Sequence, residues 1–149
     1  MKFEFSAGGI VLRQAQDKKE KTGIKILVAQ HSQHHGWVFP KGLIGDKIKD
    51  ESKESTALRE VEEETGVRGK ILKELEPVTY WYVFEGEKIK KTVHYYIMEY
   101  ISGDIKNHDW EMENVEWAPI NKVEEKLTYK SDKEVWEKAK EEIIHFTSS

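Results

Sequence analysis

Residues 59–66 read REVEEETG and place four glutamates within five positions. They end a segment, from Ser52 to Thr65, that is predicted to be a helix, because Ser52 is a good N-cap and Gly66 a good C-cap. Like charges one turn apart destabilise a helix by about 0.2–0.5 kcal/mol per pair. Helix formation alone therefore does not explain so much negative charge in so short a stretch.

On a helical wheel the apolar residues and the acids of this segment separate. One arc, which we expect to pack on a sheet, holds Ala57, Leu58, Val61 and Thr65. A second arc, expected on the far side, holds three carboxylates: Glu60, Glu63 and Glu64. Glu62 is separate from both arcs. Arg59 lies one turn before Glu63 and is expected to pair with it.

Three carboxylates that project together from one helix have two interpretations. One is a solvated acidic face, which is common on helices. The other is a metal site, because carboxylate oxygens without His or Cys suit magnesium or manganese rather than zinc. The preceding loop favours the metal site, since it brings Lys41 and a glycine-rich backbone next to the acids. We therefore expect magnesium as the cofactor, with manganese as the alternative.

The composition excludes several other classes of protein. The chain has 149 residues, about the length of one domain, and we expect a single domain over residues 1–149. A net charge of −4 with both signs mixed argues against a nucleic-acid or membrane surface. There is no cysteine for disulfide or thiolate chemistry. No apolar run approaches the roughly 20 residues that span a bilayer, and we expect a cytoplasmic protein. The oligomeric state stays open between monomer and dimer.

The pattern of apolar residues predicts strands on both sides of the central helix. They are expected at 3–12, 24–29, 37–39, 71–75, 78–84, 88–100 and 115–118, with turns at 14–22 and 85–86 and a loop at 41–50. Further helices are expected at 121–127 and 133–146. This order predicts an α/β fold with a mixed β-sheet between helices.

The spacing of residues 45–67 resembles the Nudix box, G-x5-E-x7-R-E-U-x-E-E-x-G-U, in which U is apolar. Its fixed positions are filled by Gly45, Glu51, Arg59, Glu60, Val61, Glu63, Glu64, Gly66 and Val67. The resemblance implies a Nudix-like α/β/α sandwich and metal-dependent hydrolysis of a nucleoside diphosphate linked to another group. It also implies that three glutamates bind metal, Glu60, Glu63 and Glu64, and that Arg59 orients the carboxylates.

One spacing departs from the family's pattern. In many relatives the box glycine directly follows Pro-Lys, but Pro40-Lys41-Gly42 lies three residues further from Arg59 than that spacing requires. Either Gly45 is the box glycine, or Gly42 is and the loop carries an insertion. We favour the insertion, because a loop accepts extra length more easily than a helix. Gly42 is then the expected backbone contact to the metal.

Residues 34–42, HHGWVFPKG, resemble the stretch before the box in hydrolases of dinucleoside polyphosphates, particularly diadenosine tetraphosphate. That resemblance implies asymmetric cleavage to ATP and AMP, with adenine stacked on a tyrosine downstream of the box. We match this tyrosine to Tyr82, with Tyr80 as a second candidate. The other expected substrate contacts are Lys41, Lys91 and His35, with His34 beside it. A segment of the family in which a glutamate precedes an aromatic by six positions singles out Glu111, so the general base is expected to be Glu60 or Glu111.

Other functions stay open within this resemblance. They are pyrophosphohydrolysis of a nucleoside triphosphate, of an RNA 5′ end or of a diphosphoinositol polyphosphate. A nucleotide sensor that binds without turnover is a further alternative. The filled box argues against a sensor, because relatives that lose catalysis usually lose acids of the box.

Overall fold

The computed structural model describes residues 1–14 and 23–147, so most of the turn expected at 14–22 lies outside the described residues. The strands are β1 (Lys2–Gln14), β2 (Ile24–His31), β3 (Trp37–Val38), β4 (Lys41–Leu43), β5 (Val67–Glu74), β6 (Val78–Phe84), β7 (Glu87–Gly103) and β8 (Met112–Pro119). The helices are α1 (Lys53–Thr65), α2 (Val123–Lys126) and α3 (Lys130–Thr147), with 3-10 turns η1 (Ile105–Asn107) and η2 (Ile120–Lys122).

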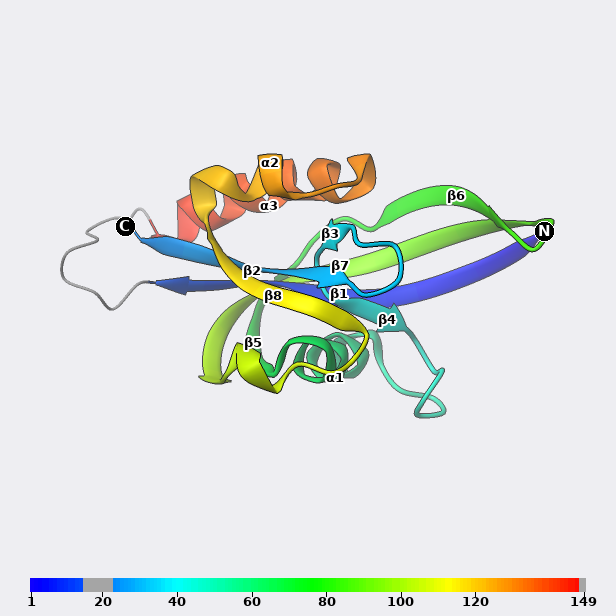
Figure 1. Ribbon diagram of the computed structural model, residues 1–149, viewed down its shortest axis with the longest axis horizontal. Helices are drawn as coiled ribbons and strands as arrows, with labels where there is room; N and C mark the ends of the chain where they lie inside the picture. The colour runs from blue at the N-terminus through cyan, green and yellow to red at the C-terminus, as the bar shows by residue number, and fades with distance from the viewer. Residues whose placement is uncertain (15–22, 148–149) are drawn as a thin grey trace.

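The strands form one mixed sheet with the central order β3-β2-β1-β7-β5, in which β4 also pairs with β1, β6 with β7, and β8 with β2. Strands β1 and β7 are parallel over their length, and the other pairs are antiparallel. Helices α2 and α3 cover one face and α1 covers the other (Figure 1). The expected α/β/α sandwich with a mixed sheet between helices is confirmed.

Alternate residues of the central strands supply two separate cores, as the period of two in a strand requires. On β1, Ile10 and Leu12 belong to the core beneath α3, together with the fully buried Trp136. The intervening Val11 belongs to the core beneath α1, where it joins Val61 of the helix. One face of the sheet therefore packs against α1, and the other face packs against α3.

The central helix begins and ends where its capping residues predict. The Ser52 hydroxyl accepts a hydrogen bond from the Ser55 N–H at 3.1 Å. Gly66 ends the helix with a φ of 80°, a left-handed conformation that glycine adopts without strain. The expected packing face is largely confirmed: its members Ala57, Val61 and Thr65 are fully buried, although Leu58 is only half-buried.

Two expectations about this region were wrong. The loop expected at 41–50 begins with strand β4, which pairs antiparallel with β1 through Gly42 and Ala7. Because β4 lies against α1, two of the three acids do not project into solvent on the far side of the helix. Glu60 and Glu64 are instead 4% and 3% exposed. The wheel grouped the acids correctly but did not reveal the strand that covers them.

Other element boundaries differ by a few residues. The C-terminal helix begins at Lys130 rather than 133, so the buried Asp132 lies in its first turn, where a carboxylate interacts favourably with the helix dipole. Strand β5 starts directly after Gly66 and strand β7 extends to Gly103.

Candidate active site

The acids of α1 face the backbone of β4. The Lys41 N–H donates a hydrogen bond of 2.9 Å to Oε2 of Glu64. Next along the strand, a Cβ built on Gly42 would lie 2.1 Å from Cδ of Glu60. Glu63, with its side chain 35% exposed, lies at the rim of the same group. The three acids therefore form one cluster, between the helix and a short strand that carries no side chain at Gly42.

Arg59 ties this cluster together. Its Nη1 donates to Oε1 of Glu60 at 3.0 Å and to Oε1 of Glu63 at 3.1 Å, so the predicted Arg59–Glu63 pair is confirmed. Its Nε and Nη2 donate to both oxygens of Glu51 at 2.9 and 2.8 Å. Glu51 thus serves as an anchor that holds the guanidinium against the acids of the cluster.

A second cation, Lys47 in the loop between β4 and α1, also reaches the acids. Its Nζ lies 2.5 Å from Oε2 of Glu63 and 3.7 Å from Oε1 of Glu60. These contacts, chiefly the hydrogen bond to Glu63, raise the pKa of Lys47. No motif or spacing in the sequence predicts this exposed lysine at the cluster.

The pKa values of the acids reflect burial opposed by these two cations. Burial raises the pKa of Glu60, although Lys47 and Arg59 act against it. Burial raises the pKa of Glu64 well above its ordinary value. For Glu63 burial acts in the same direction, but the hydrogen bonds from Lys47 and Arg59 outweigh it and lower the pKa. Buried carboxylates with raised pKa values are stabilised as anions when a further cation arrives.

The donor set fits a hard divalent cation. Its side-chain ligands would all be carboxylate oxygens, and the backbone at Gly42 approaches Glu60 closely enough to share an ion with it. As they stand, however, no three His, Cys, Asp or Glu side chains among the described residues are arranged to hold a metal ion. Lys47 and Arg59 occupy carboxylate oxygens that such an ion would use.

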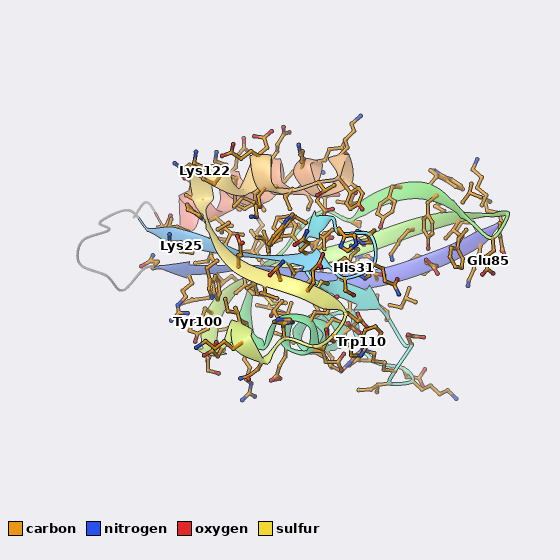
Figure 2. The ribbon with its side chains drawn as sticks, viewed as in Figure 1. Lys25, His31, Glu85, Tyr100, Trp110 and Lys122 are labelled. Carbon is orange, nitrogen blue, oxygen red and sulfur yellow. The ribbon has the colours of Figure 1, made fainter. Side chains whose placement is uncertain are left out.

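A cavity of about 560 Å³ lies directly beside the acids. Its wall includes Glu64 and Lys41, which belong to the acid cluster and the strand that covers it. The rest of the wall is mainly aromatic and cationic, with His31 (labelled in Figure 2 at the end of β2), His34, Phe39, Tyr80, Tyr82, Lys91 and Tyr129. The cavity can therefore accommodate a ring system while facing the acids.

Three of the predicted substrate residues, Lys41, Tyr82 and Lys91, line this cavity. The Tyr82 hydroxyl donates a hydrogen bond to Glu4, and its ring lies 6.3 Å from that of Tyr80. Glu4 and Lys91 are directly opposite each other on β1 and β7. Burial lowers the pKa of Lys91.

His35 was predicted to contact substrate, but the structure does not bring it into the cavity. Its side chain is 63% exposed, and Nδ1 lies 2.5 Å from Oε1 of Glu113. The preceding His34 lines the cavity instead and stacks on His31 with ring centroids 4.2 Å apart. Its Nδ1 contacts the Tyr129 hydroxyl at 2.8 Å.

Glu111 reaches the site from the segment before β8. The Asp109 N–H donates to the Glu63 carbonyl oxygen at 3.2 Å and so holds this segment near the end of α1. Figure 2 labels Trp110 of the same segment beside the start of β8. Glu111 lines the cavity and, with burial, contributes to the raised pKa of Glu64. The predicted fourth acid is thus brought to the cluster.

Asp132 is a cavity residue that the sequence did not suggest. It is 5% exposed, and its Oδ1 lies 3.4 Å from the Tyr95 hydroxyl. Burial raises its pKa, although Lys41 and the backbone of Phe39 act against this. In the sequence Asp132 directly precedes the helix expected at 133–146, and an aspartate at that position is usually an ordinary N-cap.

Comparison with known proteins identifies the family to which this fold and site belong. The model of the NUDIX domain matches residues 4–139, and the chain belongs to the Nudix family. No helix among the described residues has the length and apolar character needed to cross a membrane.

Two curated proteins are similar to this chain in sequence. A Mycobacterium tuberculosis protein with the provisional name mutator protein MutT4 is 36% identical over 142 residues, 94% of this chain and 56% of that protein. An 8-oxo-(d)GTP phosphatase of Mycolicibacterium smegmatis is 28% identical over 134 residues, 87% of this chain and 39% of that protein. The chain therefore spans only about half, or less, of these curated relatives.

A crystal structure of a C. elegans Ap4A hydrolase binary complex is similar in fold. Its TM-score is 0.76 with 21% sequence identity, and the alignment covers 96% of this chain and 99% of that one. At this identity the likeness concerns the fold alone.

Proposed function

We propose that this protein hydrolyses dinucleoside polyphosphates with the help of a divalent metal, and that it splits diadenosine tetraphosphate asymmetrically into ATP and AMP. The observation that carries this proposal is the junction of the acid cluster with the aromatic cavity, at Lys41 and Glu64. A nucleoside held in the cavity directs its phosphate chain along Lys41 towards the acids.

Glu60, Glu63 and Glu64, with the backbone of Gly42, are the groups that would hold magnesium or manganese. The metal would screen the phosphate charge and lower the pKa of a bound water towards neutrality. Arg59 keeps two of the carboxylates oriented through its hydrogen bonds of 3.0 and 3.1 Å. A carboxylate beside the attacking water, Glu60 or Glu111, accepts its proton.

The cavity supplies the groups that bind the rest of the substrate. The ring of Tyr82, supported by Tyr80, offers a stacking surface for adenine, and such stacking contributes about 1–3 kcal/mol per base. Lys41 and Lys91 present ammonium groups to the phosphates as point charges. His34 and Tyr129, in contact at 2.8 Å, form another part of the wall.

A second candidate function is pyrophosphohydrolysis of a purine nucleoside triphosphate. The name of one curated relative, 8-oxo-(d)GTP phosphatase, favours it. Asp132 also favours it, because a buried carboxylate in the cavity wall can accept hydrogen bonds from the N–H groups on the edge of a guanine-type base. Hydrolysis of a triphosphate would use the same acids, but the protein would bind one nucleoside instead of two.

One experiment distinguishes these functions. Diadenosine tetraphosphate, ATP, dGTP and 8-oxo-dGTP are each incubated with the protein and magnesium, and products are separated by chromatography. The proposal predicts ATP and AMP in equal amounts from the dinucleotide, with the highest kcat/KM of the panel. Faster release of pyrophosphate from a triphosphate would favour the second candidate, and binding without any product would identify a sensor.

A further inference from the structure

The two cations at the acid cluster differ in how firmly they are held. The Arg59 side chain is 16% exposed and is anchored by Glu51, which is itself 3% exposed. The Lys47 side chain is 45% exposed and contacts Glu63 and Glu60. Lys47 can therefore leave the cluster without opening the core, whereas Arg59 cannot.

Lys47 also occupies the oxygens that the metal would need. Its Nζ lies 2.5 Å from Oε2 of Glu63 and within 3.7 Å of Oε1 of Glu60, two of the three proposed ligands. An ammonium group in this position repels a divalent cation and takes up a lone pair of Glu63 that the cation would use, so the two compete for the acids.

The position of Lys47 in the chain suits such a role. It lies in the segment between β4 and α1, which is three residues longer than the family's pattern if Gly42 is the box glycine, as we favour. A longer loop has the reach to carry its ammonium back onto the helix, and the freedom to withdraw it.

We propose that Lys47 is a built-in counter-cation of the metal site, which neutralises Glu60 and Glu63 in the metal-free protein and must be displaced when a divalent cation binds. Lys47 thereby sets the affinity of the site for metal. The inference rests on the metal site proposed above, but not on the identity of the nucleotide. A Lys47 that leaves the acids on metal binding becomes a free cation at the edge of the site.

The test measures binding of Mn²⁺ without substrate, from the electron paramagnetic resonance signal of the free ion. Lys47→Met keeps most of the side-chain length and removes the charge. Lys49→Met, at an exposed position in the same loop, is the matched control for a general loss of positive charge. Exposed ion pairs are weak, so Lys47→Met is expected to lower the dissociation constant for Mn²⁺ by about 2- to 10-fold relative to Lys49→Met.

Thermal unfolding gives a second readout. Without metal, Lys47→Met is expected to melt below the wild type, because Glu60 and Glu63 lose their neutralising partner; with saturating Mn²⁺ the difference should disappear. Equal Mn²⁺ affinities in the two variants, or weaker binding by Lys47→Met, would overturn the inference. If the wild type binds no Mn²⁺, the metal site itself is refuted, whereas a negative result in the nucleotide panel alone would leave Lys47 in its role.

Discussion

Gly42 of β4 lies against the carboxylate of Glu60 on α1, so closely that a Cβ built on the glycine would be 2.1 Å from Cδ and 2.3 Å from Oε2 of the glutamate. Glu60 is 4% exposed and has little room to move aside. Only glycine is compatible with this contact, and the bare backbone of β4 therefore fixes one of the proposed metal ligands.

The first prediction follows from this contact. Gly42→Ala should push the Glu60 carboxylate out of position and lower kcat in saturating magnesium by about 10- to 100-fold, because small misplacements of a reacting group are costly. Gly45→Ala is the matched comparison: its φ of 78° strains an alanine, but nothing lies within 4 Å of the added Cβ. It should lower the melting temperature and largely preserve kcat. A larger loss of kcat in Gly45→Ala would make Gly45 the box glycine.

The second prediction concerns acid stability. The hydrogen bonds from Arg59, with help from Thr56 and Ser55, lower the pKa of Glu51 to about 2, against an ordinary value of 4.5. Because the folded pKa is depressed, Glu51 contributes stability that is fully present above pH 4.5 and is lost as the pH falls towards 2. This amounts to about 1–3 kcal/mol.

The measurement compares urea unfolding of the wild type and Glu51→Gln between pH 7 and pH 3. The wild type should have the larger free energy of unfolding at pH 7. The difference between the two proteins should become smaller as the pH falls below 4.5. A difference in the free energy of unfolding that stays constant with pH would show that the ionised Glu51–Arg59 pair does not stabilise the fold.

The third prediction concerns the cavity. Tyr82→Ala should raise KM for diadenosine tetraphosphate by roughly 5- to 100-fold with a smaller effect on kcat, because a stacking surface for a base is lost. Tyr82→Phe keeps the ring and loses only the hydrogen bond to Glu4, so its KM should stay within about threefold of the wild type. Equal effects of the two substitutions would assign the role to the hydroxyl instead.

The fourth prediction concerns Asp132. Asp132→Ala should raise KM for purine nucleotides by about 10-fold if the carboxylate accepts hydrogen bonds from the base, since hydrogen bonds to charged groups contribute about 1.5–3 kcal/mol. Asp132→Asn, of the same shape, should change the ratio of kcat/KM between guanine and adenine nucleotides, because an amide both donates and accepts. A lower melting temperature with unchanged KM and unchanged base preference would leave Asp132 a purely structural role.

The sequence predicted much of this molecule because several signals agreed locally. Ser52 and Gly66 fix the ends of α1, and the spacing from Glu51 to Glu64 specifies both the helix phase and the acid cluster. The alternation of apolar residues likewise predicted the long central strands and the mixed sheet.

The features that the sequence missed all depend on contacts distant along the chain. Strand β4 is only three residues long, too short for a periodic pattern, and it exists because β1 offers a partner to Gly42. Asp132 meets Lys41 and the cavity across some 90 positions of sequence. His35 and His34 look equivalent in the sequence, but His34 contacts Tyr129 and lines the cavity, whereas His35 contacts Glu113 outside it.

The central claim is that the acids of α1 are the hydrolytic centre, and two neighbouring substitutions test it most directly. Glu63 belongs to the cluster, whereas Glu62 is exposed and 3.6 Å from Arg68 on the outer side of the helix. With diadenosine tetraphosphate in saturating magnesium, Glu63→Gln should lower kcat by about 100-fold or more while remaining folded, and Glu62→Gln should stay within a few-fold of the wild type. Near-normal turnover by Glu63→Gln, or an equal loss in both variants, would contradict the account.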